Sequence, residues 1–306
     1  MAAVLNSNVA SLWASKNLQG AQNKMADSVE RLSSGLRINR AKDDAAGLGI
    51  ANALTSQINS ANQGVRNLND GISMVQTAEG AIAAAQEMGQ RILTLATQGA
   101  NGTLTYTDRT AIQSEMRQML TAIEAIGKRT NYSSNSLLNV NSTTAVGTAK
   151  FTLQSSNTTT DTISLDSTAF KRIGSNGTVT LATGLSEGQA SDLTHKINHA
   201  DFTGSSTSAA NALAAANAIQ TAAADYVSAL SVQRSLLGAY QNQIEFTVNN
   251  VNELSSNLSA ARSNVQDTDY ASETASLTKG QILQQAATAM LAQANQMPNV
   301  ILSLLK

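Results

Sequence analysis

The chain has 306 residues and a formal net charge of −1, with 13% charged and 3% aromatic residues, a single proline and no cysteine. A charge this close to zero argues against a general nucleic-acid or membrane-surface binder, and the lack of cysteine excludes disulfides, thiol catalysis and cysteine-based metal sites. Because proline interrupts it only once, nearly the whole chain is free to form helix.

The first predicted element is a helix over residues 1–36, which Gly35 ends. Its apolar residues recur three or four positions apart, so they share one helix face, as in the seam of a coiled coil. The members of this stripe are Leu18, Ala21, Met25, Val29, Leu32 and Leu36. Such a stripe needs a partner helix, which the other end of the chain or a neighbouring molecule would supply.

A basic connector over residues 37–42 follows, and the longest helix begins after the pair Asp43-Asp44. Two adjacent carboxylates could serve acid–base catalysis, but the sequence shows no third polar partner for them. We expect them to cap the helix, because an N-cap Asp accepts hydrogen bonds from the free backbone N–H groups of the first turn.

The long helix is expected to end at the Gly- and Asn-containing turn of residues 99–102. One apolar stripe on it runs from Leu48 to Ala96, and a second runs beside it from Met74 to Leu95. Two stripes require two neighbours, so the sequence predicts a bundle of at least three helices. The next predicted helix covers residues 106–129.

Helical periodicity is lost in the middle of the chain. Residues 150–165 alternate apolar and polar around a Ser/Asn/Thr turn, which predicts a β-hairpin, and the Gly, Ser and Thr of residues 171–206 are typical of an exposed surface segment. A helix resumes near Ser208, and residues 265–270 form a second connector. The predicted fold is mainly α, a long antiparallel helical bundle or coiled coil built from both chain ends, with a small β-hairpin region in the middle.

The last predicted helix carries the most regular stripe of the chain, with spacings of four and three in strict alternation. Its members are Leu283, Ala287, Met290, Ala294, Met297, Ile301 and Leu304. The two ends of the chain therefore carry similar coiled-coil stripes, a pattern typical of a rod or a polymer subunit.

Six sequence motifs stand at the two ends of the chain. Towards the N-terminus they are residues 30–39 (ERLSSGLRIN), 41–48 (AKDDAAGL) and 69–80 (NDGISMVQTAEG). Towards the C-terminus they are residues 267–271 (DTDYA), 281–286 (QILQQA) and 291–296 (LAQANQ). In this order they closely resemble the signature motifs of bacterial flagellins. The resemblance covers about residues 1–140 and 208–306, and the number and length of the motifs make it specific.

The resemblance implies a structural subunit, not an enzyme, that self-assembles into the bacterial flagellar filament for swimming motility. In flagellins the paired terminal helices form the inner layer of a tube, and the long middle helices surround it. The implied domains are residues 1–42 plus 265–306 (inner coiled coil with connectors), 43–170 plus 207–264 (helical bundle with hairpin) and 171–206 (short variable surface segment, no full outer domain). The expected assembly seam comprises Leu18, Met25, Val29, Leu32, Leu283, Met290, Met297, Ile301 and Leu304.

The resemblance also implies the partners and the location of the chain. The partners are its own copies in a helical homopolymer, the flagellar export apparatus, a flagellin-specific export chaperone on the C-terminal helix, and the filament cap and hook-junction proteins. The expected location is extracellular, in the flagellum, after export without a cleaved signal peptide, because residues 1–8 lack a basic n-region followed by an apolar core. No apolar run approaches the roughly 20 residues that span a bilayer, so we expect no membrane insertion.

A further role that the resemblance implies is recognition of the monomer by the flagellin-sensing Toll-like receptor. The contact positions of the family correspond to Arg91, Leu95 and Glu115, and all three residue types are retained. Leu93 and Thr94 depart from the Arg-Glu pair common there in enterobacterial members. The alternative interpretation is that Leu95 is a core residue and that Arg91 and Glu115 are ordinary surface charges.

No cofactor, catalytic or metal site is expected. His195 and His199 have a spacing that can bind zinc on a helix, but Lys196 stands where an HExxH motif needs its general-base Glu, and these are the only two histidines.

Three alternative functions remain. The nearest is a hook–filament junction protein, which shares the terminal motifs, although the strong middle motifs and the ending Leu304-Leu305-Lys306 favour flagellin proper. A signalling coiled coil of the chemoreceptor type would need a membrane span or a long charged heptad face, and an enzyme would need a catalytic constellation. The sequence shows none of these features.

Overall fold

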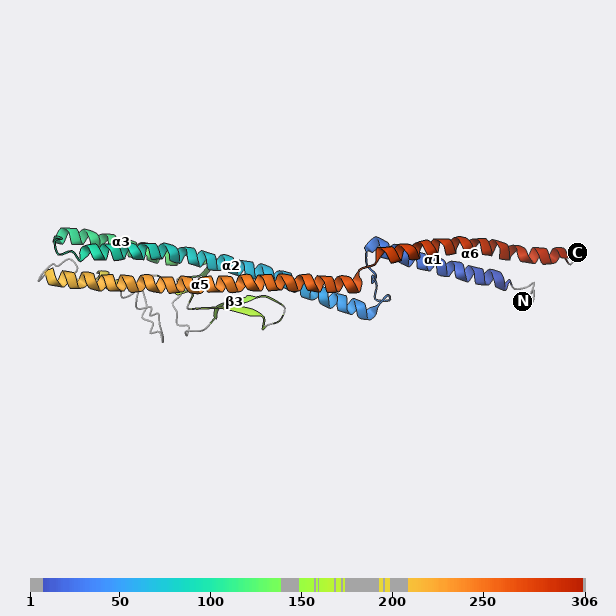
Figure 1. Ribbon diagram of the computed structural model, residues 1–306, viewed down its shortest axis with the longest axis horizontal. Helices are drawn as coiled ribbons and strands as arrows, with labels where there is room; N and C mark the ends of the chain where they lie inside the picture. Colours follow the sequence, from blue (N-terminus) through green and yellow to red (C-terminus); the bar gives the residue numbers. More distant parts are fainter. Residues whose placement is uncertain are drawn as a thin grey trace. The chain divides into compact units, whose positions relative to one another are not determined.

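The computed structural model describes residues 8–138, 149–156, 158, 160–167, 169–171, 173, 193–194, 196–198 and 209–304. The fold is mainly helical, as predicted, and its long helices are α1 (Val9–Ser34), α2 (Ala45–Gly99), α3 (Tyr106–Arg129), α5 (Ala209–Gln266) and α6 (Tyr270–Leu304) (Figure 1). The chain divides into two compact units, a first unit of Met1–Asn59 with Ser255–Lys306 and a second unit of Ser60–Leu254. The first unit therefore includes the opening turns of α2 and the last turns of α5.

The first unit pairs α1 with α6 in antiparallel orientation (Figure 1). The Asn8 side chain, which caps α1, donates a hydrogen bond to the Ala294 carbonyl at 2.8 Å, whereas Gly280 lies opposite Met25. Gly35 ends α1 with a left-handed φ of 74°. This confirms the predicted helix end, because glycine adopts this conformation without the steric cost of a Cβ atom.

Backbone hydrogen bonds join the two connectors of the first unit. Leu36 and Asp267 form an antiparallel bridge, and the Arg37 N–H donates to the Gln266 carbonyl at 2.7 Å. Because α5 continues through Gln266 and α6 begins at Tyr270, the second connector comprises residues 267–269 and is shorter than predicted.

The two carboxylates that precede α2 have different structural roles. Asp44 accepts a hydrogen bond from the Gly47 N–H at 2.9 Å, which confirms the expected helix cap. Asp43 instead accepts from the N–H groups of Arg40 and Asn39, at 3.0 and 3.2 Å, and so holds the first connector in its turn. The hydrogen bond from Arg40 lowers the pKa of the Asp43 carboxyl below its usual value.

The second unit is a bundle in which α2, α3 and α5 share one core. Both predicted stripes of α2 reach this core, since Leu68, Val75 and Ile82 of one stripe and Ala78 and Ile92 of the other are buried there. The apolar residues that meet them include Ile112, Met116 and Ile123 of α3, and Tyr226, Leu237 and Ile244 of α5. The predicted bundle of at least three helices is therefore confirmed.

Polar contacts fix the antiparallel pairing of α2 with α5. Arg234 forms an ion pair with Glu79 at 3.3 Å and donates to the Gln86 side chain at 3.0 Å. Towards the other end of the pair, the Gln220 amide donates to the Thr97 hydroxyl at 3.2 Å.

The predicted hairpin is confirmed, with β3 (Ala149–Gln154) paired antiparallel to β4 (Thr162–Asp166). It packs against α2. The contact requires glycine on the helix. A Cβ atom built at Gly64 would lie 1.9 Å from the Ser155 carbonyl oxygen, and one at Gly71 would lie 2.2 Å from a Leu153 methyl carbon. Between them, the Asn67 amide donates to the Gln154 carbonyl at 3.1 Å.

A second, very short hairpin of β1 (Asn131–Tyr132) and β2 (Asn135–Ser136) follows α3 and was not predicted. Its turn residues, Ser133 and Ser134, have positive φ angles of 46° and 70°. Such turns usually carry Gly or Asn, so serine gave no signal in the sequence.

Lys150 of β3 connects this region to the large hairpin. Its ammonium group donates to the Leu137 carbonyl and lies 5.3 and 5.5 Å from the ring centroids of Phe151 and Phe170. Burial lowers the pKa of the Lys150 amine to about 8.

The segment of residues 171–206, expected on the surface, lies largely outside the described residues. Among its described residues, Ile173, Leu193 and Ile197 are buried in the core of the second unit. The Gln113 amide of α3 donates to the Ile197 carbonyl at 2.7 Å. These residues of the segment therefore belong to the bundle.

Candidate assembly surface

Small residues form the line along which α1 and α6 touch in the first unit. The buried positions recur every seven residues on both helices, and they are Ala14, Ala21 and Ser28 of α1 and Gly280, Ala287 and Ala294 of α6. Small side chains let two helix backbones approach closely. Between these positions, Leu18, Met25 and Leu32 of α1 and Leu291 of α6 are half-buried. Other large apolar residues of both helices are exposed beside the contact line.

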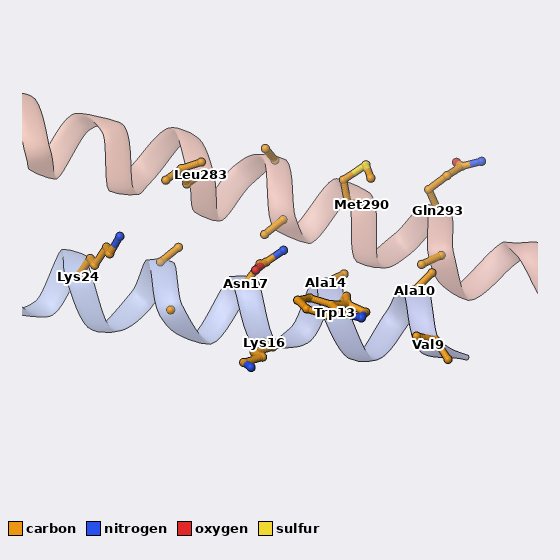
Figure 2. A pocket seen from close by; sticks show the side chains of 15 residues that line it. Val9, Ala10, Trp13, Ala14, Lys16, Asn17, Lys24, Leu283, Met290 and Gln293 are labelled. Atoms are coloured by element: carbon orange, nitrogen blue, oxygen red, sulfur yellow. The ribbon is translucent and has the colours of Figure 1, made fainter. Parts of the chain in front are cut away.

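Some of these larger residues line a groove of about 880 Å³ between α1 and α6 (Figure 2). Trp13 of α1 and Met290 of α6 border it with exposed fractions of 61% and 66%. Lys16 and Lys24 add positive charge, and the Lys16 ammonium lies 5.7 Å from the centroid of the Trp13 ring. The groove thus offers open apolar surface accompanied by cations (hereafter the α1/α6 groove).

The seam residues expected on α1 differ in how far they are buried. Leu18, Met25 and Leu32 are half-buried, whereas Val29 is 50% exposed. Ser28, which the apolar pattern passed over, takes the buried position next to Val29.

The two expected seam residues of α6 whose side chains the structure describes lie outside the contact line. Leu283 and Met290 are exposed and line the groove. Met297, Ile301 and Leu304 belong to α6, but their side chains lie outside the part of the chain that the structure describes.

The stripe predicted on α6 includes Ala287 and Ala294, which are buried in the contact line, but it missed Gly280. Gly280, Gln284, Ala287, Leu291 and Ala294 keep the alternation of four and three, but only one of them is large and apolar. The signal that would have revealed Gly280 is its spacing of seven residues from Ala287, which Ala294 repeats.

Two ion pairs lie at the end of the first unit that carries the connectors. Arg40 reaches Glu30 at 2.8 Å, and Arg31 of α1 lies 3.7 Å from Glu273 of α6. Exposed pairs of this kind contribute at most about 1 kcal/mol each. The small contact line and these weak pairs leave α1 and α6 with much apolar surface uncovered.

The three residues expected at the receptor contact lie near one another in the second unit. The guanidinium of Arg91 donates two hydrogen bonds to one carboxylate oxygen of Glu115, at 2.9 and 3.2 Å, and both side chains are exposed. Leu95, one turn further along α2, is only 2% exposed and lies in the core.

Neither a metal-binding group nor a membrane-spanning helix is found in the described part of the chain. It contains no group of three or more His, Cys, Asp or Glu residues able to hold a metal ion, and His195 and His199 lie outside it. Within the same described residues, no helix combines the length and the apolarity needed to cross a membrane.

Comparison with known proteins places both ends of the chain in one family. Residues 5–143 match the family described as bacterial flagellin N-terminal helical region, and residues 217–305 match the bacterial flagellin C-terminal helical region. A flagellin of Halalkalibacterium halodurans is 36% identical over 303 residues, which cover 99% of this chain and 100% of the relative. A flagellin of Bacillus subtilis is 36% identical over 309 residues, with 99% of each chain covered.

A solved structure shares the fold. It is described as a putative flagellar hook-associated protein from Vibrio parahaemolyticus, and it aligns with a TM-score of 0.54 over 74% of this chain and 100% of the other. At 16% identity this likeness concerns the fold alone. The two family matches and the full-length relatives are decisive: this chain belongs to the bacterial flagellins, a family of structural proteins and not of enzymes.

Proposed function

We propose that the chain is a subunit of the bacterial flagellar filament, assembling outside the cell into a helical homopolymer that serves swimming motility. The observation that supports this most directly is the α1/α6 groove, where Trp13 and Met290 are exposed. Open apolar patches of this kind mark protein–protein contacts. A contact between two different surfaces of identical copies, when its rotation does not close into a ring, repeats into a helical polymer.

The proposal includes the partners that the subunit meets before and during assembly. These are the export apparatus, which would pass the chain without cleaving a signal peptide, an export chaperone on α6, and the cap and hook-junction proteins. The exposed Leu283 and Met290 of α6 support the chaperone, because apolar residues need cover until the polymer forms.

Electron microscopy of the purified chain after seeding or salting tests the filament proposal. We expect long tubes from the full chain and none from a variant lacking residues 265–306, because the deletion removes α6 and one wall of the groove. A full chain that stayed monomeric, or formed only short caps, would contradict the proposal and favour the alternative of a hook–filament junction protein.

We also propose that the flagellin-sensing Toll-like receptor recognises the monomer through the exposed Arg91–Glu115 ion pair. Leu95 would support this surface from the core without touching the receptor, because it is buried. Replacing Arg91 by alanine is expected to lower the response of receptor-expressing reporter cells by about tenfold or more, since interface arginines are frequent hot spots. Arg66→Ala, an exposed arginine on the same helix, is the control. Equal responses of the two variants would contradict the receptor proposal.

A further inference from the structure

The turn between α2 and α3 contains an asparagine followed by a glycine, Asn101-Gly102. In such a pair the backbone nitrogen of the glycine can attack the side-chain carbonyl carbon of the asparagine, because glycine has no Cβ atom to obstruct the approach. Both residues are exposed to solvent here. The other asparagine–glycine pair of the sequence, at residues 176–177, lies outside the described part of the chain. The turn therefore holds two groups that can react with each other side by side.

The side chain of Asn101 is held in a way that favours this attack. Within the described residues, neither the Gly102 N–H nor the side-chain amide nitrogen of Asn101 donates a hydrogen bond. Oδ1 of Asn101, by contrast, accepts from the N–H and from the hydroxyl of Thr103, at 3.1 and 2.9 Å. Negative charge develops on this oxygen when a nucleophile attacks the carbonyl carbon, and donors that are already in place stabilise that charge.

The main-chain carbonyl oxygen of Asn101 is also held by two donors. They are Nη2 of Arg109, at 3.2 Å, and the Leu104 N–H, at 3.3 Å. Arg109 is only 5% exposed, and among the described residues it has no ion-pair partner and its Nε has no hydrogen-bond partner. A buried guanidinium without a counter-charge is stabilised by a nearby anion. A carboxylate in place of this carbonyl would supply that anion.

We propose that Asn101 is a self-modifying site that becomes isoaspartate. The Gly102 nitrogen loses its proton to hydroxide and bonds to Cγ of Asn101. The bond from Cγ to the amide nitrogen breaks, and that nitrogen takes a proton from water and leaves as ammonia. Water then adds to the main-chain carbonyl carbon of the resulting succinimide ring, because Arg109 and Leu104 polarise this carbonyl. The bond from this carbon to the Gly102 nitrogen breaks, and that nitrogen stays bonded to Cγ.

The product places a carboxylate beside Arg109. In isoaspartate the chain continues through Cγ, so the former main-chain carbonyl that accepts from Arg109 becomes the free carboxylate. The conversion consumes water and releases ammonia, with no change of oxidation state. It adds one negative charge to an exposed turn of a chain whose formal net charge is −1. Because the reaction needs only the turn itself, the modified fraction increases with the age of the subunit.

Ageing the purified chain in mildly alkaline buffer tests the first step. Peptide mass spectrometry should find isoaspartate at position 101, whereas Asn59, which is exposed inside α2, should remain asparagine. Gly102→Ala should slow the conversion at least about tenfold. The added methyl group would meet no atom within 4 Å, so the turn keeps its structure. If position 101 of the unmodified chain stayed asparagine, the proposal would be wrong.

A variant of Thr103 tests whether the turn promotes the reaction. Thr103→Val removes the hydroxyl donor to Oδ1 and should slow the conversion about fivefold, the effect of one hydrogen bond. The matched control is Thr107→Val, since Thr107 is also exposed and lies on α3. It should convert at the rate of the unmodified chain. Equal rates for the two valine variants would contradict the proposal.

The ratio of the two possible products tests the second step. Water that adds to the main-chain carbonyl gives isoaspartate, and water that adds to the side-chain carbonyl gives aspartate. Arg109 and Leu104 polarise the main-chain carbonyl only in the folded chain. We therefore expect the ratio of isoaspartate to aspartate at position 101 to be at least about threefold higher in the folded chain than in guanidinium chloride. Equal ratios would overturn the proposed role of Arg109 and with it the proposal.

Discussion

Replacing Met290 by lysine is expected to stop filament assembly while the monomer keeps its fold. Met290 is 66% exposed, so the free subunit loses little by the change. In the filament, the same position is expected to be covered by a neighbouring copy. Lys16 and Lys24 already line the groove, so a third cation there would be buried without a carboxylate partner, which costs several kcal/mol. The critical concentration should rise by at least about 100-fold.

The matched control is Met290→Leu, which keeps an apolar side chain of similar volume and should assemble at nearly the normal concentration. Sedimentation of seeded samples measures the polymer in both variants, and far-UV circular dichroism checks the helix content of the monomers. If Met290→Lys formed filaments at the concentration of the unmodified chain, the α1/α6 groove would not be an assembly surface.

Local signals in the sequence were sufficient to place several helix ends. Gly35 ends α1 in the left-handed conformation that its position suggested, and Asp44 caps α2. The region of residues 149–166 follows its alternating pattern into a hairpin. In each of these places the physical cause lies within a few residues of the feature, so the sequence alone could reveal it.

Features that depend on distant parts of the chain could not be predicted in this way. Arg109 of α3 is almost fully buried and donates to the Asn101 carbonyl at 3.2 Å, although an arginine normally marks a solvent-exposed face. The buried positions of the α1–α6 contact are alanine, serine and glycine. The predicted stripes included Ala21, Ala287 and Ala294 but passed over Ala14, Ser28 and Gly280, whose burial depends on the partner helix. The packing of the two terminal helices was therefore predicted from the sequence, while the structure shows which faces of these helices remain open.

Replacing Gly64 by alanine is expected to destabilise the second unit, although alanine is the better helix former. The propensity gain of about 0.5–1 kcal/mol is outweighed because the new methyl would lie 1.9 Å from the Ser155 carbonyl oxygen, a backbone atom that moves only with the hairpin. Overpacking of this kind costs about 1–3 kcal/mol, and displacing the hairpin also strains the hydrogen bond from Asn67 to Gln154. We therefore expect the free energy of unfolding to fall by about 1–2 kcal/mol.

Gly80→Ala separates the two effects, because Gly80 is also inside α2 but a methyl group added there would meet no atom within 4 Å. It should raise the free energy of unfolding by about 0.5–1 kcal/mol. Urea unfolding of both variants, monitored by circular dichroism, measures whether each substitution lowers or raises the free energy of unfolding. A stabilised Gly64→Ala protein would mean that the hairpin does not rest on α2, and the two glycines would then be equivalent. If the free energy of unfolding falls for Gly64→Ala and rises for Gly80→Ala, position 64 requires glycine because the hairpin approaches α2 there. The contact with the hairpin would then offset the destabilising effect of glycine on the helix.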